Sequence, residues 1–211
     1  NPTAFGYAAG VWSGLFLARI GSRHHYSAGS QDINSRFVAS KLLYGANSQL
    51  PFPDLPRTDF LLMLGANPLV SRGSAVRAPR IKDDLTAIVR RGGRVVVIDP
   101  RRTETARAHE HIAVKPDSDA WLLLSLLNVI FAGGLEDSAA IARQSAGAEV
   151  LRSLCAPFTP EDTAVRTGLP ADVVRALARD FATAPTATAY GRTGACLGNH
   201  GTLVSFLLDA L

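Results

Sequence analysis

Three short polar segments, each directly after an apolar run, carry the residues of this chain best suited to contact a nucleotide. The first is the turn Gly65-Ala66-Asn67-Pro68. Glycine there would let the backbone approach a phosphate or a ribose, and a following helix would point its N–H groups at an anion. The Asn67 amide offers both donors and an acceptor. The alternative is an ordinary turn that ends a strand.

The second segment follows the apolar residues 95–98. Asp99 lies where a doubly wound fold places a ribose-binding acid, although it is further from Gly65 than the usual spacing of roughly 20 residues. An Asp that caps the following turn is an equal alternative. Arg101 and Arg102 could meet a pyrophosphate through their planar guanidinium groups or stay in solvent, and only one of them needs to bind.

The third segment is Asp117-Ser118-Asp119, at the start of a strongly apolar stretch. Guanine presents two neighbouring N–H donors, and one carboxylate can accept from both. The competing interpretation is a helix N-cap, which suits Asp117 better than Asp119. Residues 117–119 therefore combine a candidate base reader with a candidate cap.

The surrounding pattern of apolar runs and turns predicts an α/β fold. A strand at 60–64, a helix at 74–91 with a possible distortion at Pro79, and a strand at 94–99 form a parallel strand–helix–strand unit. Further strands are expected at 111–114 and 186–190. We predict a Rossmann-like three-layer domain with a mostly parallel sheet flanked by helices.

Extra helical structure is expected between residues 118 and 183. Its predicted pieces are an apolar helix to about 132, helices at 136–146, 160–165 and 171–182, and a turn near Cys155. A closing helix is expected from about 201 to 211. The N-terminal part predicts a helix at 4–20, a loop at 21–31, and a helix from Asp32 to about Tyr44, with Phe37, Val38, Leu42 and Leu43 as core candidates.

Composition limits the class of protein. Of the 211 residues, 47% are apolar, which is enough for a sizeable core. No apolar run reaches the roughly 18 uncharged residues of a membrane span, and no secretion signal opens the chain. The two cysteines are too few and too far apart for a disulfide framework, an iron–sulfur site or a zinc site. Because the chain begins on Asn and ends inside a helical pattern, we expect a piece of a longer protein.

The net charge of +4 is unevenly distributed. Residues 57–107 contain ten Arg and one Lys against five acids. Arginine suits phosphate oxygens, although part of this set is explained by a solvated helix face. Because no basic run is interleaved with aromatic residues, nucleic acid is not expected as a partner.

Taken in order, the motifs resemble one family. They are Leu64-Gly-Ala-Asn-Pro-Leu-Val-Ser71, Val97-Ile-Asp-Pro-Arg-Arg-Thr-Glu-Thr105, His111-Ile-Ala-Val-Lys-Pro-Asp-Ser-Asp119 and Tyr190-Gly-Arg-Thr-Gly194. The series is similar to that of the molybdopterin oxidoreductases of the dimethyl sulfoxide reductase type. The resemblance implies that residues 1–211 form a single cofactor-binding domain of a larger catalytic subunit.

The resemblance also implies a cofactor and its binding residues. The cofactor is bis(molybdopterin guanine dinucleotide) with molybdenum, and a 4Fe-4S cluster would lie elsewhere in the full-length protein. Asp119 would read guanine. The remaining cofactor-binding candidates are Gly65, Ala66, Asn67, Pro68, Asp99, Arg101, Arg102, Thr103, Asp117, Gly191 and Arg192. The implied partners are other domains of the same subunit and an electron-transfer subunit, with no membrane insertion and a cytoplasmic location.

The metal end would lie in the loop at 26–32. The family often supplies one molybdenum ligand from this loop, and Asp32 falls at or next to that position. Asp32 is therefore the catalytic and metal-ligand candidate, with a helix N-cap as the alternative. The loop contains no Cys, which argues against formate dehydrogenase activity. His24 and His25 could relay protons or simply occupy a surface loop.

The sequence leaves two other functions open. An ordinary nicotinamide-dinucleotide-binding Rossmann module predicts a Gly-x-Gly-x-x-Gly turn, which residues 65–68 do not supply. A non-catalytic α/β interaction domain would leave Asp119 and the arginine cluster without a ligand.

Overall fold

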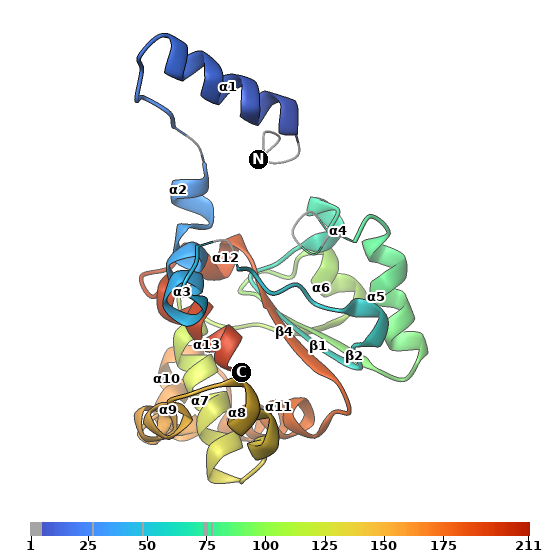
Figure 1. Ribbon diagram of the computed structural model, residues 1–211. Helices are drawn as coiled ribbons and strands as arrows, with labels where there is room; N and C mark the ends of the chain where they lie inside the picture. Colours follow the sequence, from blue (N-terminus) through green and yellow to red (C-terminus); the bar gives the residue numbers. More distant parts are fainter. Residues whose placement is uncertain (1–5, 27, 48, 74–75, 77) are drawn as a thin grey trace.

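The chain is organised around a sheet of four parallel strands. The computed structural model describes residues 6–26, 28–47, 49–73, 76 and 78–211. Within them, β1 (Phe60–Leu64), β2 (Arg94–Ile98), β3 (Glu110–Ile112) and β4 (Ala187–Gly191) pair in the order β3-β2-β1-β4 (Figure 1). All three pairings are parallel. This confirms the predicted α/β class with a mostly parallel sheet.

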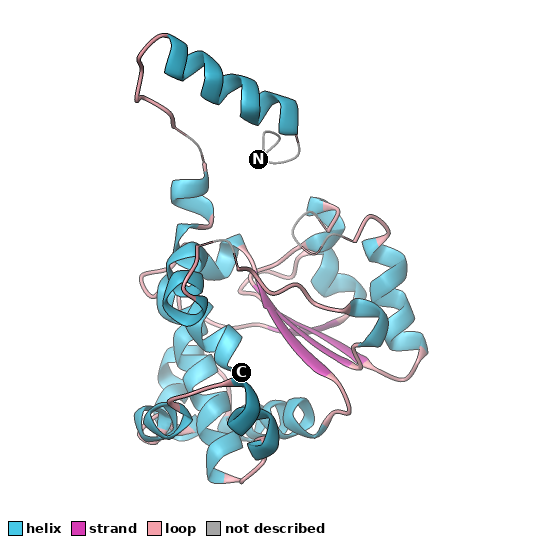
Figure 2. Cartoon of the chain, in the orientation of Figure 1, coloured by secondary structure: helices cyan, strands magenta, loops and turns pink. Residues whose placement is uncertain are grey.

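Helices cover both faces of this sheet (Figure 2). The helices of the described residues are α1 (Tyr7–Arg19), α2 (Gly29–Asp32), α3 (Asn34–Tyr44), α4 (Pro68–Ser71), α5 (Ile81–Arg90), α6 (Glu104–Ala108), α7 (Asp119–Ala132), α8 (Ser138–Gln144), α9 (Ala148–Cys155), α10 (Pro160–Thr167), α11 (Ala171–Thr183), α12 (Thr193–Cys196) and α13 (Gly201–Ala210). The expected extra helical segment between 118 and 183 is thus α7 to α11. No helix among the described residues combines the length and apolarity needed to cross a membrane.

The alternation of side chains along the central strands produces two separate cores. Leu62 and Leu64 of β1 face a cluster built with α7, α11 and α13, whereas Leu61 and Met63 face one built with α5 and α6. Every residue of β1 is buried, as expected of a parallel strand covered on both sides. Three layers result.

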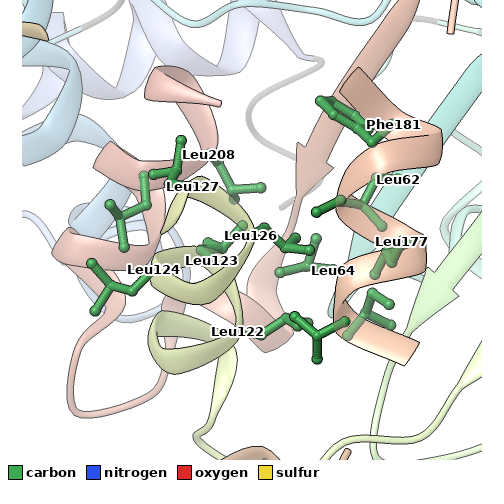
Figure 3. Packing of buried hydrophobic residues seen from close by; sticks show 14 of the residues in the cluster. Leu62, Leu64, Leu122, Leu123, Leu124, Leu126, Leu127, Leu177, Phe181 and Leu208 are labelled. Atoms are coloured by element: carbon green, nitrogen blue, oxygen red, sulfur yellow. The ribbon is translucent and has the colours of Figure 1, made fainter. Parts of the chain in front are cut away.

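The larger core is centred on α7. Leu122, Leu123, Leu126 and Leu127 lie between the sheet, α11 and α13, and Figure 3 shows them with Leu177 and Leu208 from the flanking helices. Nine residues of α7 are buried, so the helix is apolar around most of its circumference. The predicted apolar helix to about residue 132 is present as α7.

Several predicted boundaries are wrong. The helix expected from 74 starts at Ile81, so Pro79 precedes it rather than distorting it, and a separate short helix, α4, begins at Pro68. Residues 74, 75 and 77 lie outside the described part. The third strand is Glu110–Ile112 rather than 111–114, because Ile112 pairs with Ile98, the last residue of β2, and no further residue of β2 is left to pair. Helix α9 was not predicted.

The two helices predicted in the N-terminal part are present as α1 and α3, but the cap and the buried face predicted for the second are wrong. Helix α3 begins at Asn34 with Ile33 at its cap position, so Asp32 ends α2 and does not cap the next helix. Val38 and Leu42, two of the expected core residues, are exposed; the buried residues of α3 are Ala39 and Ser40, and α3 packs against α13. A helical apolar spacing identified the helix but not which face would be covered.

Helix α1 lies apart from the rest of the chain (Figure 1). Its side chains Val11, Trp12, Leu15 and Phe16 are 55–69% exposed. A helix of 13 residues is marginal in water without a packing partner. The described chain therefore leaves one strongly apolar helix uncovered.

Candidate cofactor-binding site

The candidate residues gather at the carboxyl edge of the sheet. Because all four strands are parallel, the loops after β1, β2, β3 and β4 leave from the same edge. The strand order reverses between β1 and β4, since β2 and β3 lie on one side of β1 and β4 lies on the other. In open parallel sheets, ligands bind at the carboxyl ends of strands beside such a reversal.

The turn after β1 contacts the loop after β4. The Gly194 N–H donates to the Gly65 carbonyl at 3.1 Å, and the Arg192 N–H donates to the Leu64 carbonyl at 3.1 Å. Gly65 has φ +55°, and a Cβ built on it would lie 2.4 Å from the Ala195 nitrogen. The need for glycine at position 65 is therefore explained by this backbone contact, rather than by the phosphate approach that the sequence suggested.

Asn67 joins the turn after β1 to α6, the helix after β2. Its Oδ1 accepts from the Thr105 N–H at 3.3 Å and from the Thr105 hydroxyl at 2.8 Å, and its Nδ2 donates to Glu104 Oε2 at 2.7 Å. That last bond holds the pKa of Glu104 below its usual range. The Asn67 amide is thus largely used within the protein, with one amide hydrogen left over.

The loop after β2 presents one carboxylate oxygen and two guanidinium groups. Asp99 Oδ1 accepts from the Arg101 N–H at 2.8 Å, which is the turn cap considered as an alternative, while Oδ2 has no hydrogen-bond partner among the described residues. Arg101 lies 3.5 Å from Glu104 and is exposed, and Arg102 is exposed. Thr103 is buried and caps α6 by accepting from the Ala106 N–H.

Asp117 does not cap α7. Its φ is +61°, and its carboxylate accepts from the Asn199 backbone N–H at 2.9 Å and from the Asn199 side-chain amide. Ser118 takes the cap position without a side-chain capping bond, because its hydroxyl donates to the Lys115 carbonyl instead. The N-cap interpretation of Asp117 is therefore wrong.

Asp119 is the first residue of α7, is partly buried and has no ion pair in the described part of the chain. Burial, and to a smaller extent the neighbouring charges of Asp117 and Asp99, raise the pKa of its carboxyl to about 6. An ionised carboxylate in this position is therefore poorly solvated and has no cationic partner among the described residues. It is a stronger acceptor for an incoming N–H donor than a solvated acid would be.

The remaining candidates lie on the β4 side of the edge. Gly191 packs against α13, since a Cβ there would lie 2.3 Å from Leu208 Cδ1. Arg192 lines a small cavity of about 90 Å³ with Arg36, Tyr190 and Asp209. Burial raises the pKa of Tyr190 to about 12.

Asp32 lies near Cys196, the last residue of α12. It is half-buried at the end of α2, and its charge adds a small increment to the pKa of the Cys196 thiol, which burial mainly raises. No group of three His, Cys, Asp or Glu side chains within the described ranges is arranged to hold a metal ion. Cys155 and Cys196 are buried free thiols.

The structure thus brings Asp99 and Asp117 close enough to Asp119 for their charges to act on it, whereas the charge of Asp32 acts on Cys196. Asn199, Glu104 and Thr105 hold the predicted residues in place, and none of the three was predicted from the sequence. Their partners are 82, 37 and 38 positions away in sequence, so no local pattern signals them.

A parallel three-layer α/β domain with its polar loops at a strand-order reversal defines a nucleotide-binding class of protein. Residues 10–156 match the family model described as molybdopterin oxidoreductase. The chain therefore belongs to the molybdopterin oxidoreductase family, and the resemblance to the dimethyl sulfoxide reductase type is confirmed.

Relatives with different substrates support this assignment. The chain is 34% identical to formate dehydrogenase H from Escherichia coli over 64% of its length, and 27% identical to thiosulfate reductase molybdopterin-containing subunit PhsA from Salmonella typhimurium over 77%. It spans 18% and 21% of those two proteins. The structure of acetylene hydratase from Pelobacter acetylenicus matches 92% of the chain with a TM-score of 0.78 at 23% identity, which supports the fold; the match covers 26% of that protein.

Proposed function

We propose that this chain is the domain of a molybdenum-dependent oxidoreductase that binds a guanine dinucleotide end of a bis(molybdopterin guanine dinucleotide) cofactor. The observation that carries the proposal is Asp119. Its carboxylate is partly buried, lies at the carboxyl edge of the sheet and has no ion pair among the described residues. Guanine N1–H and N2–H would supply the two donors that such a carboxylate lacks.

The other edge residues have separate roles in this proposal. The free Asp99 Oδ2 would accept from a ribose hydroxyl, and the exposed Arg101 and Arg102 would neutralise pyrophosphate. The turns that shape the carboxyl edge of the sheet are held by Gly65, Ala66, Asn67, Pro68 and Thr103. Gly191 ends β4, and Arg192 begins the loop that follows it.

The bound cofactor would supply two-electron redox chemistry at molybdenum, while the protein supplies binding and electrostatics. Asp32 is our candidate for the protein ligand, because a hard carboxylate oxygen suits oxidised molybdenum. Because residues 26–32 contain no Cys, this loop cannot supply a thiolate ligand to the metal.

We further propose that residues 1–211 act as one domain of a larger catalytic subunit. The uncovered apolar surface of α1 supports this, as does the fact that the chain spans about a fifth of its curated relatives. Other domains of the subunit, a 4Fe-4S cluster held by one of them, and an electron-transfer subunit would complete the enzyme. The isolated domain would be inactive.

Nucleotide binding by the 211-residue chain tests the proposal. Calorimetric titration should show that GDP binds at least about 10-fold more tightly than ADP, since adenine does not present the two adjacent donors. Asp119→Asn should remove this preference. Asp172→Asn, which changes an exposed acid in the first turn of α11, should retain it.

In the full-length protein, Asp119→Asn should lower the molybdenum content measured by metal analysis. Equal affinity of the wild-type chain for GDP and ADP, or normal molybdenum content in the Asp119→Asn protein, would overturn the proposed role of Asp119.

A further inference from the structure

The loops that follow the two outer strands of the sheet are joined by one side chain. Asp117 belongs to the loop after β3, and Asn199 belongs to the segment after β4; these are the two outer strands. Both carboxylate oxygens of Asp117 are used. Oδ1 accepts from the Asn199 backbone N–H at 2.9 Å, and Oδ2 accepts from the Asn199 side-chain amide.

The backbone at Asp117 is in the left-handed region, with φ +61°. Non-glycine residues rarely adopt this conformation, although Asp tolerates it better than most. Two charge-assisted hydrogen bonds offset the strain. The approach is also close enough to require Gly198, because a Cβ there would lie 2.1 Å from Asp117 Oδ1.

Further contacts fix the same loop on either side of Asp119. The Ser118 hydroxyl donates to the Lys115 carbonyl at 2.6 Å, and the Lys115 N–H donates to the Thr167 carbonyl at 2.9 Å. The ring of Trp121 meets the ring of His200, the residue after Asn199, edge-on at 6.2 Å between centroids. The loop is therefore held at 115, 117, 118 and 121, while Asp119 pairs with no other described side chain.

We propose that Asp117 is a positioning residue, which uses Asn199 to hold the loop so that the Asp119 carboxylate faces the base of a bound guanine nucleotide. This inference rests on the proposed function. It assigns Asp117 no contact with the ligand. It makes the segment after β4 a determinant of base specificity, through a contact more than 80 residues away in sequence.

Base discrimination, rather than stability, is the decisive readout. GDP and inosine diphosphate differ only in the guanine 2-amino group, which is one of the two donors that Asp119 would accept. The wild-type chain should bind GDP about 10-fold or more tightly than inosine diphosphate, since a hydrogen bond to a charged group contributes that much.

Asn199→Ala removes the side-chain amide that donates to Asp117 Oδ2 but keeps the backbone N–H that donates to Oδ1, whereas Asp117→Gly removes both hydrogen bonds, the charge and the backbone strain. Each variant should reduce the preference for GDP over inosine diphosphate to about 2-fold or less, and the double variant should be no worse than either single one. Asn128→Ala is the matched control, because its amide also donates to two carbonyls, those of Cys155 and Ala156, in another part of the molecule. It should keep the wild-type preference even where it lowers the melting temperature.

The outcomes separate the two proposals. If the wild-type chain does not distinguish GDP from ADP, the proposed function fails and this inference fails with it. If the wild-type chain distinguishes GDP from inosine diphosphate and Asp117→Gly, which lacks both hydrogen bonds to residue 199, retains that discrimination, guanine reading stands and the positioning role of Asp117 is overturned.

Discussion

At the scale of the residue, the ionised Asp119 carboxylate lowers the stability of the unliganded chain, but the proposed guanine binding requires it. Burial and two neighbouring acids raise the pKa of its carboxyl from 3.8 to about 6. Because the folded state holds this proton more tightly than the unfolded state, the contribution to stability is most favourable below about pH 4. It is lost as the pH rises from 4 to 6, and the full cost of ionisation is present above that range.

Asp119→Asn should therefore stabilise the unliganded chain at pH 7 by roughly 2–3 kcal/mol, an upper estimate from two pKa units. The gain should shrink as the pH falls from 6 to 4. Urea denaturation across pH 4–8 measures it, with Asp172→Asn expected to change stability by no more than about 0.5 kcal/mol. A gain that is independent of pH would show that the Asp119 carboxyl is not perturbed in the folded state.

At the scale of the element, the contact between the β1 turn and the β4 loop determines the shape of the carboxyl edge. Gly65 and Gly194 touch through backbone atoms alone, with a Cβ added at either position less than 3 Å from the other segment. Two strands that are neighbours in space but more than 120 residues apart in sequence are thereby brought together at the strand-order reversal. No side chain fits between these two turns.

Gly65→Ala should destabilise the chain by about 3–5 kcal/mol, because it combines an unfavourable positive φ with a backbone clash. Gly92→Ala is the matched control, since Gly92 has φ +85° and nothing lies within 4 Å of the position that its new methyl group would take. It should cost only about 1–2 kcal/mol. Denaturant midpoints measured with unchanged m-values provide the comparison, and equal losses for the two variants would contradict the close approach at Gly65.

At the scale of the whole molecule, stability and assembly depend on different surfaces. The domain has its own cores on both faces of the sheet, whereas α1 contributes four exposed large apolar side chains. The chain has two tryptophans, Trp12 on α1 and Trp121 on α7. Trp12 is 69% exposed, so it reports on whether α1 is covered.

In the 211-residue chain, Trp12→Gln should change the free energy of unfolding by less than about 0.5 kcal/mol, whereas Leu123→Ala should lower it by about 2–5 kcal/mol. With Trp121 replaced by Phe, acrylamide should quench Trp12 readily in this chain and poorly in the larger catalytic subunit proposed above. Equal quenching in both would show that the rest of the subunit does not cover α1.

The sequence by itself determined the class of the fold, because buried parallel strands require continuous apolar runs and each run here ends at a turn. It also determined the three loops at the carboxyl edge and the family. The hydrogen bonds that individual polar residues make in these loops depend on the tertiary structure. Asn67 is tied to α6, Thr103 caps it, and Asp117 pairs with Asn199 instead of capping α7. The physical reason is that a hydrogen bond needs two groups within about 3 Å, and only the folded chain brings such distant partners together.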